Sequence, residues 1–164
     1  MPADEYSRPA TLQDLKHVIQ ALNEEGAQYL LIGGYALFSH GYHRTTEAID
    51  LLLPADSDLA RPVIDALLVL SDRESANIKP EWFDEGENIR LADEVVVDLI
   101  FKTCGETYES LLPYMEIMDL DGLAVKTLNL EGLLKTKQSP RAKDVLDRTV
   151  LEKAISVIKS ADER

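Results

Sequence analysis

The residues best suited to chemistry lie between Tyr29 and Pro54. An apolar run, residues 29–32, ends in Gly33 and Gly34, and a short segment of helical character follows them. Where a glycine turn begins a helix, unpaired backbone N–H groups and the helix dipole favour an anion. This arrangement predicts a phosphate-binding turn at Gly33 and Gly34.

A second strand is predicted after this short helix, from Thr46 to Leu53. Alternate side chains of a strand face opposite sides, so positions 46, 48, 50 and 52 share one face. Asp50 therefore projects on the same side as Ala48. Its carboxylate is the kind of ligand that Mg²⁺ prefers in proteins.

A second carboxylate, Asp98, interrupts the apolar run 95–101, which is typical of a central strand covered on both faces. A lone ionised carboxylate is costly to bury. We therefore expect Asp98 to pair with an arginine or to bind a cation. The run and the segment from Ile89 predict two strands with a turn near Asp93 and Glu94.

The stretch from Tyr29 to Pro54 resembles the nucleotidyltransferase superfamily that includes DNA polymerase β, and within it the AbiEii-type toxins of type IV toxin–antitoxin systems. That branch reads roughly apolar-I-G-G-x-A, a short helix ending in H-G, then R-x-T-x-D-I-D and an apolar strand. The matching positions here are Ile32, Gly33, Gly34, Ala36, His40, Gly41, Arg44, Thr46, Ile49 and Asp50. Ala48 stands where the family has the first aspartate of D-x-D.

This resemblance implies Mg²⁺-dependent transfer of a nucleoside monophosphate from an NTP, with Asp50 and Asp98 as catalytic carboxylates and metal ligands. Two aspartates spaced two apart on a strand suit a pair of Mg²⁺ ions. Ala48 offers no oxygen, so the two-ion site is expected to be weakened. The adjacent Glu47 points to the opposite face of the strand.

Nucleotide binding is implied for the two glycines and for Arg44 and Thr46. Arg44 precedes the carboxylate strand, where its planar fork could hold a phosphate or orient Asp50. An ion pair with a neighbouring acid is the alternative for Arg44.

A second motif, L-L-x-x-K followed by R-x-K-D-x-x-D, resembles the C-terminal motif of the family. Lys137 is our candidate for contacting the triphosphate of the incoming nucleotide. The alternative is an ion-pair latch between two helices, which we favour for Arg141 and Asp144. Lys143 and Asp147 complete the motif.

The remaining pattern predicts an α/β (α+β) domain of the nucleotidyltransferase fold, a mixed sheet flanked by helices, over residues 11–160 after a flexible arm at 1–10. Predicted helices cover 11–25, 34–40 and a segment after Asp56, with two more after Asn129 and Ser139. The predicted strands are 27–32, 46–53, the pair from Ile89, and a hairpin at 115–128.

The chain has 164 residues, of which 45% are hydrophobic, which fits a single compact domain. It lacks an apolar stretch of membrane-spanning length and a signal-peptide pattern, so we expect a cytoplasmic protein. The one cysteine, Cys104, rules out an intrachain disulfide and is expected to be a small buried residue. A net charge of −13 disfavours non-specific nucleic-acid binding, although bases gather at 135–148.

Three functions are consistent with these features. The first is a nucleotidyltransferase acting on the end of tRNA, as a toxin with a cognate antitoxin partner, present here in an inactivated form because Ala48 was introduced. The second is a naturally degenerate member that binds a nucleotide or a partner protein without turnover. The third is a nucleotidyltransferase that modifies a small molecule such as an antibiotic.

Overall fold

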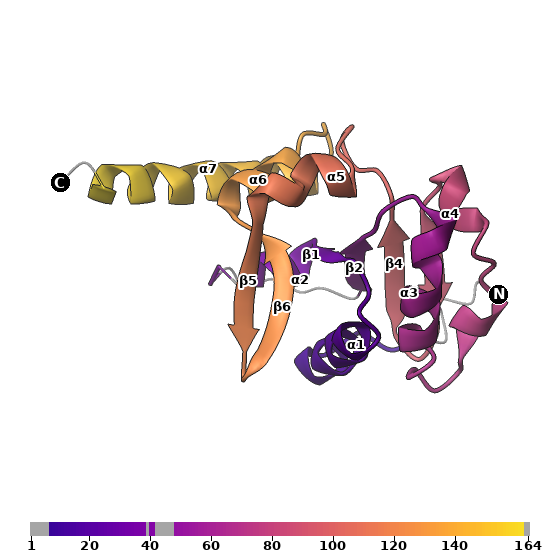
Figure 1. Cartoon of the computed structure of the whole chain (residues 1–164). Coiled ribbons are helices and arrows are strands. Elements are labelled where there is room, and N and C mark those ends of the chain that lie inside the picture. The colour runs from indigo at the N-terminus through magenta and orange to yellow at the C-terminus, as the bar shows by residue number, and fades with distance from the viewer. Residues whose placement is uncertain (1–6, 39, 42–47, 163–164) are drawn as a thin grey trace.

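The protein folds around one six-stranded mixed sheet in the order β3-β4-β2-β1-β6-β5 (Figure 1). The computed structural model describes residues 7–38, 40–41 and 48–162. The strands are β1 (Leu30–Ile32), β2 (Ala48–Leu52), β3 (Ile89–Ala92), β4 (Val96–Ile100), β5 (Met115–Leu120) and β6 (Leu123–Leu128). The central pairs β2–β4 and β1–β6 are parallel, whereas β1–β2, β3–β4 and β5–β6 are antiparallel.

The described residues form seven α-helices around the sheet, and α1 packs against α3, which lies beside β4 in Figure 1. The opposite end of the sheet is crossed by α5, α6 and α7, and the last of these extends beyond the body. The helices are α1 (Leu12–Glu24), α2 (Gly34–Phe38), α3 (Ala60–Leu67), α4 (Trp82–Glu85), α5 (Tyr108–Leu111), α6 (Leu130–Lys135) and α7 (Ala142–Asp162).

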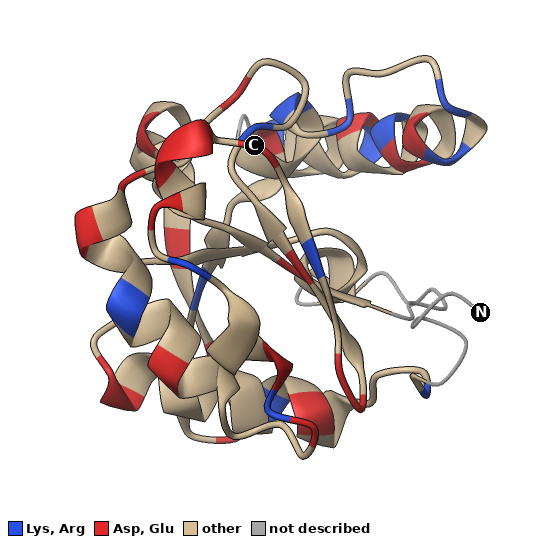
Figure 2. Ribbon diagram, turned by 90° about the vertical axis from the view of Figure 1, so that its right-hand side faces the viewer, with Lys and Arg blue, Asp and Glu red and all other residues tan. Residues whose placement is uncertain are grey.

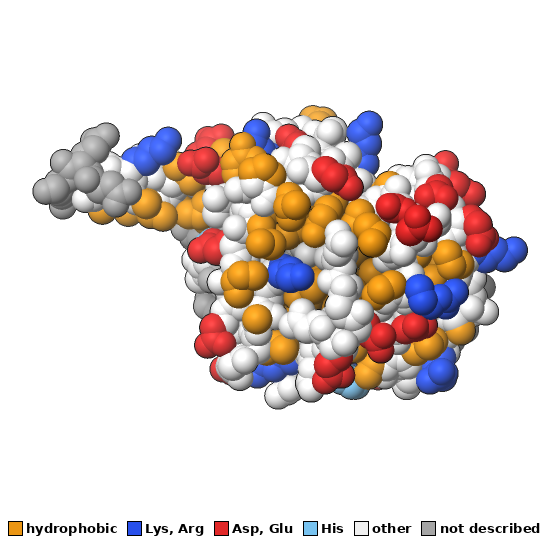
Figure 3. Space-filling view, viewed as in Figure 1, with side chains coloured by type: hydrophobic (Ala, Val, Ile, Leu, Met, Phe, Trp, Pro, Cys, Tyr) orange, Lys and Arg blue, Asp and Glu red, His pale blue; other side chains and the backbone are white. Residues whose placement is uncertain are grey.

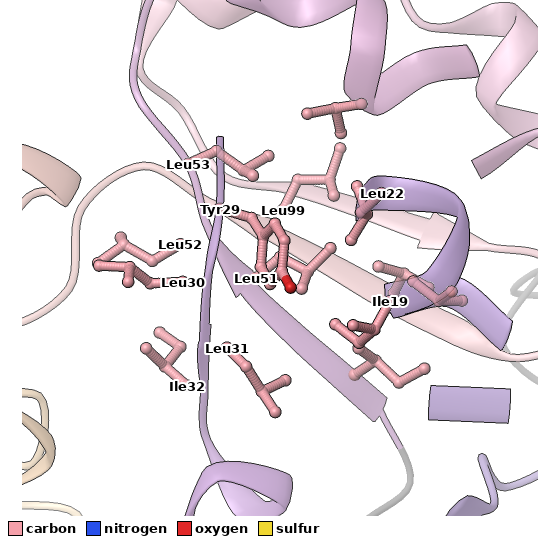
Figure 4. Packing of buried hydrophobic residues seen from close by; sticks show 14 of the residues in the cluster. Ile19, Leu22, Tyr29, Leu30, Leu31, Ile32, Leu51, Leu52, Leu53 and Leu99 are labelled. Atoms are coloured by element: carbon pink, nitrogen blue, oxygen red, sulfur yellow. The ribbon is translucent and has the colours of Figure 1, made fainter. Parts of the chain in front are cut away.

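The strand register separates the side chains of β1 and β2 into two faces. Leu31 pairs with Leu51, and their side chains lie with Tyr29 and Leu99 on the side of α1 (Figure 4). Leu30 pairs with Leu52 on the other face, and all of these residues are fully buried. Ile32 pairs with Asp50. The carboxylate of Asp50 therefore lies on the sheet face opposite α1.

Local sequence signals explain the ends of the helices that flank the sheet. The side chain of Thr11 accepts a hydrogen bond from the N–H of Asp14, and the Asp14 carboxylate accepts one from the N–H of Thr11, which is a capping box. Asn129 caps α6 by accepting from the N–H of Gly132. Both helix starts agree with the sequence prediction.

The predicted α/β architecture with a mixed sheet is confirmed, and the elements differ mainly in length. The first strand is shorter than predicted, and the connection 71–88 contains α4, whose Phe83 is buried and stacks edge-on against Phe101. The expectation for Cys104 was wrong: it is exposed, because β4 ends at Ile100 and the chain turns before the cysteine. Within the described ranges, no helix is both long and apolar enough to cross a membrane.

Candidate functional site

Asp50 and Asp98 lie side by side on neighbouring strands. The parallel register of β2 and β4 pairs Asp50 with Asp98, and paired strands are about 4.8 Å apart. Parallel partners project to the same face, so both carboxyl groups point away from α1. The two residues are 48 positions apart in sequence, and only the sheet brings them together.

Gly33 is the residue that lets the backbone approach Asp50. Its φ is +77°, a conformation that favours glycine, and a Cβ added there would lie 2.1 Å from the Oδ2 atom of Asp50. Any larger residue would therefore displace the carboxylate. The glycine turn and the acidic strand form one unit in space.

Arg90 is a further residue of the site, one that the motifs did not indicate. It pairs with Asp98 in the antiparallel register of β3 and β4, and its Nη1 atom is 3.5 Å from the Oδ2 of Asp98. Asp98 therefore makes the predicted ion pair with an arginine and also lies beside Asp50. The signal was the predicted turn near Asp93, which places Arg90 opposite Asp98.

The motif near the start of α7 forms a buried ion-pair cluster. The Nζ atom of Lys137 lies 3.2 Å from Oδ2 of Asp147 and 3.8 Å from Oδ1 of Asp144. Arg141 Nη2 lies 3.1 Å from Oδ2 of Asp144, and the Ser139 hydroxyl donates to the same oxygen. Lys137 is only 7% exposed. The predicted Arg141–Asp144 pair is therefore present, but it lies at the start of α7 and does not join two helices; Lys137 instead connects the segment after α6 to α7.

These groups line one cavity of about 500 Å³. Its charged side chains come from both motifs and from β3: the bases are Arg90, Lys137, Arg141 and Lys143, and the acids are Asp50, Asp98 and Asp144. The uncharged lining residues are Gly33, Gly34, Ala48 and Ile100. In a chain with a net charge of −13, this cavity has one more base than acids. Such a site favours an anionic ligand.

The proximity of the two carboxylates changes the acidity of Asp50. Burial, the negative charge of Asp98 and a hydrogen bond between the two groups raise the pKa of Asp50 from 3.8 to about 7, against smaller opposing effects of Lys137 and Arg90. Burial also raises the pKa of Asp144. Hydrogen bonds from Ser139 and Arg141, together with the charges of Lys137 and Arg141, lower it by more, so the pKa of Asp144 lies below its ordinary value.

The donors in this cavity fit one hard divalent cation. Asp50 and Asp98 offer carboxylate oxygens on one face, and their mutual repulsion is the kind that a cation relieves. Mg²⁺ commonly binds through one or two carboxylates and keeps several waters or substrate phosphates. Ala48 lies on the same face of β2 and adds no oxygen. Among the described residues, no cluster of three or more histidine, cysteine or acidic side chains is arranged for a metal.

The structure brings most of the predicted site residues together. Gly33, Gly34, Ala48, Asp50, Asp98 and Lys137 all line the cavity. Arg44 and Thr46 lie outside the described residues. His40 matches the motif but lies elsewhere, with its Nε2 atom 3.1 Å from the carbonyl oxygen of Leu128.

Comparisons with known proteins support the fold. No protein-family model matches the chain, and no curated protein sequence matches it. Among solved structures, the crystal structure of a protein from Thermotoga maritima, proposed to be a nucleotidyltransferase, matches with a TM-score of 0.51 and 19% identity over 93% of each chain. The chain therefore has the nucleotidyltransferase fold.

Replacing Gly33 by alanine is expected to distort the site. The new Cβ would meet the Asp50 carboxylate 2.1 Å away, in addition to the strain of a positive φ. Gly26→Ala is the matched control, because Gly26 has φ +68° and open space around it. Urea denaturation should show a loss of about 1–2 kcal/mol for the control and a larger loss for Gly33→Ala. Equal losses would show that the close approach is unimportant.

The raised pKa of Asp50 predicts a pH-dependent stability difference. The folded-state pKa of about 7 lies above the ordinary 3.8, so ionisation opposes folding, and this contribution grows as pH rises through that window. Without divalent cations, Asp50→Asn should melt at a higher temperature than the unsubstituted chain at about pH 8 and at a similar temperature at about pH 4. The exposed Asp58→Asn should show no such trend, and a constant difference for Asp50→Asn would argue against the raised pKa.

Removing the buried cation of the ion-pair cluster is expected to cost stability. Lys137→Ala takes the ammonium from beside Asp144 and Asp147, and breaking a buried pair costs about 3 kcal/mol or more. Arg141→Ala removes a cation whose side chain is 75% exposed, so about 1 kcal/mol or less is expected. Denaturation without nucleotide measures both; a smaller loss for Lys137→Ala than for Arg141→Ala would refute the latch.

Proposed function

We propose that the chain is a member of the nucleotidyltransferases that binds a Mg²⁺–NTP complex and, in its catalytic form, transfers the nucleoside monophosphate to an acceptor. The observation that carries this proposal is the pairing of Asp50 with Asp98 beside Gly33, in a cavity that four basic side chains also line. The nucleotidyltransferase fold supports the reaction class.

In the proposed reaction, Asp50 and Asp98 hold the cation, and Gly33 and Gly34 leave room for a phosphate beside them. A bound Mg²⁺ would neutralise phosphate charge and polarise the reacting oxygen. The acceptor hydroxyl forms a bond to the α-phosphorus, the bond from that phosphorus to the β-bridging oxygen breaks, and pyrophosphate leaves with the electron pair. The proton of the hydroxyl passes to solvent.

The basic side chains of the cavity bind the triphosphate in this proposal. Arg90, Arg141 and Lys143 belong to its lining, and the long reach of arginine and lysine suits phosphate oxygens. Lys137 remains our candidate for a phosphate contact, since it lines the cavity and also pairs with Asp147. Arg44 and Thr46 are proposed for the same role from the motif alone.

We propose that Ala48 permits NTP binding but prevents efficient transfer of the nucleoside monophosphate. An aspartate at this position would face the same cavity as Asp50 and would supply the oxygen that a second ion requires. The alanine is compatible with a nucleotide bound beside one ion but leaves the two-ion site incomplete. We therefore expect the chain with Ala48 to bind an NTP and to transfer slowly or not at all.

The acceptor that we propose first is the end of tRNA, as in the toxin branch that the motifs resemble. The exposed bases Arg141 and Lys143 lie at the cavity, where they could meet an RNA backbone despite the acidic surface elsewhere. In that context the chain would act in a toxin–antitoxin pair, with an antitoxin protein as its partner.

A transfer assay with each labelled NTP, total tRNA and Mg²⁺ tests the proposal by comparing the chain that has Ala48 with its Ala48→Asp variant. We expect Ala48→Asp to label tRNA at least about tenfold faster, because a second ion site is restored. Nucleotide binding by the chain that has Ala48 is measured in parallel by calorimetry with a non-hydrolysable NTP and Mg²⁺.

Asp50→Asn and Asp98→Asn, each made in the Ala48→Asp background, should abolish labelling, while Asp58→Asn in that background should not. Turnover retained in either site variant would remove that aspartate from the catalytic group. Nucleotide binding without labelling of RNA would redirect the search to small-molecule acceptors. Failure to bind any NTP would overturn the proposal.

A further inference from the structure

Two of the basic side chains that line the cavity, those of Lys137 and Arg141, come from the segment between α6 and α7. Helix α6 ends at Lys135 and α7 begins at Ala142. This segment, residues 136–141, is called the connection below. Connecting segments are generally more mobile than the elements that they join. The contacts that fix the connection therefore decide where these two cations lie.

Arg148, in the second turn of α7, binds the backbone of the connection. Its Nη1 atom donates hydrogen bonds to the carbonyl oxygens of Lys137 and Ser139, at 2.6 and 2.7 Å. Hydrogen bonds from a charged donor are roughly twice as strong as those between neutral groups. Lys137 directly follows Thr136, the C-cap of α6, and the end of a helix is a place where carbonyl groups attract a cation.

The guanidinium group of Arg148 is used for these carbonyl groups rather than for an ion pair. Acidic and basic residues follow one another along α7, as the red and blue segments of its ribbon show (Figure 2). Asp144 lies four residues before Arg148, a spacing at which an acid and a base commonly pair. Its carboxylate is bound instead by Arg141 and by the hydroxyl group of Ser139. Within the described ranges, Arg148 makes no ion pair.

Lys137 is consequently bound by α7 at two points. Asp147 pairs with its ammonium group, and Arg148 binds its backbone carbonyl group. The first turns of α7 lie on the body of the protein and its later part projects from it, as Figure 1 and Figure 3 show. Arg148 is half-buried and is not among the described residues that line the cavity. Its effect on the cavity is therefore indirect.

We propose that Arg148 is a positioning residue of the triphosphate site. By binding the carbonyl groups of Lys137 and Ser139, it fixes the connection so that Lys137 and Arg141 present their charges to the cavity. Cations that are already held in place lose less conformational entropy when an anion binds, so positioning raises affinity. This inference rests on the function proposed above, in which these side chains bind the triphosphate. Arg148 itself does not touch the ligand.

Calorimetric titration of the full chain with inorganic tripolyphosphate and Mg²⁺ tests this role. Arg148→Met keeps an unbranched side chain but removes both hydrogen bonds, and it should weaken binding at least about tenfold. Arg148→Lys keeps a cation with N–H donors on a shorter side chain. It should therefore bind tripolyphosphate more tightly than Arg148→Met does.

Lys153→Met is the matched control, because it removes one positive charge from an exposed position of the same helix. Lys153 lies ten residues, or about 15 Å, along α7 from Lys143, which lines the cavity. At physiological salt a charge at that distance is screened, so the affinity should change less than about twofold.

Hydrogen–deuterium exchange without ligand shows whether Arg148 fixes the connection. The N–H group of Lys137 donates to the carbonyl oxygen of Leu134 at 3.1 Å, and its exchange reports on the start of the connection. Arg148→Met should speed exchange at Lys137 and in the residues up to Arg141. The amides of β2 and β4 should exchange as they do in the unsubstituted chain.

Tripolyphosphate affinity that Arg148→Met leaves unchanged would overturn the inference, even if the connection exchanged faster, because Arg148 would then have only a structural role. An equal loss of affinity in Lys153→Met would overturn it as well, since net charge alone would explain the effect. Failure of the unsubstituted chain to bind tripolyphosphate or any NTP would instead overturn the proposed function, and the inference with it.

Discussion

The repulsion between Asp50 and Asp98 is the constraint on which the rest of this structure depends. Two carboxyl groups on paired parallel strands cannot both ionise freely, and burial together with the charge of Asp98 raises the pKa of Asp50. The sheet holds them together because the opposite face of β2 and β4, with Leu51 and Leu99, is fully buried against α1 and its neighbours. A slip of one residue would turn that apolar face to solvent, so the register of the carboxylates is fixed by the core.

The cations near Asp50 and Asp98 come from two different parts of the fold. Arg90 comes from the neighbouring strand and pairs directly with Asp98 at the sheet. Lys137 comes from the segment between α6 and α7 and is shared with Asp144 and Asp147, which makes the basic wall part of the helix packing. The same side chain therefore contributes to the closure of the cavity and to its positive charge. If Lys137 contacts phosphate as proposed, this one ammonium group would couple phosphate binding to the position of α7.

Local signals in the sequence were sufficient for the glycine turn, the shared face of Ala48 and Asp50, and the buried strand around Asp98. The partnership of Asp50 with Asp98 was implied only by the family resemblance, because local patterns do not show which strands pair across 48 residues. Arg90 was accessible in principle, since a hairpin turning near Asp93 places it opposite Asp98. The exposure of Cys104 was misjudged because a cysteine soon after an apolar strand was expected to pack as a small buried residue, whereas β4 ends at Ile100 and the chain turns before it.

The residue at position 48 changes the net charge of the cavity lining. With an aspartate at this position the lining would carry four acids against four bases, whereas the alanine leaves three against four. Removing an acid makes the cavity more attractive to a polyphosphate and, at the same time, less able to hold a second divalent cation. We infer that alanine at position 48 favours binding of an anionic ligand, whereas aspartate at this position would favour turnover. An inactivated enzyme and a dedicated nucleotide-binding protein would then share the same cavity, and they would differ in whether an aspartate at position 48 restores transfer.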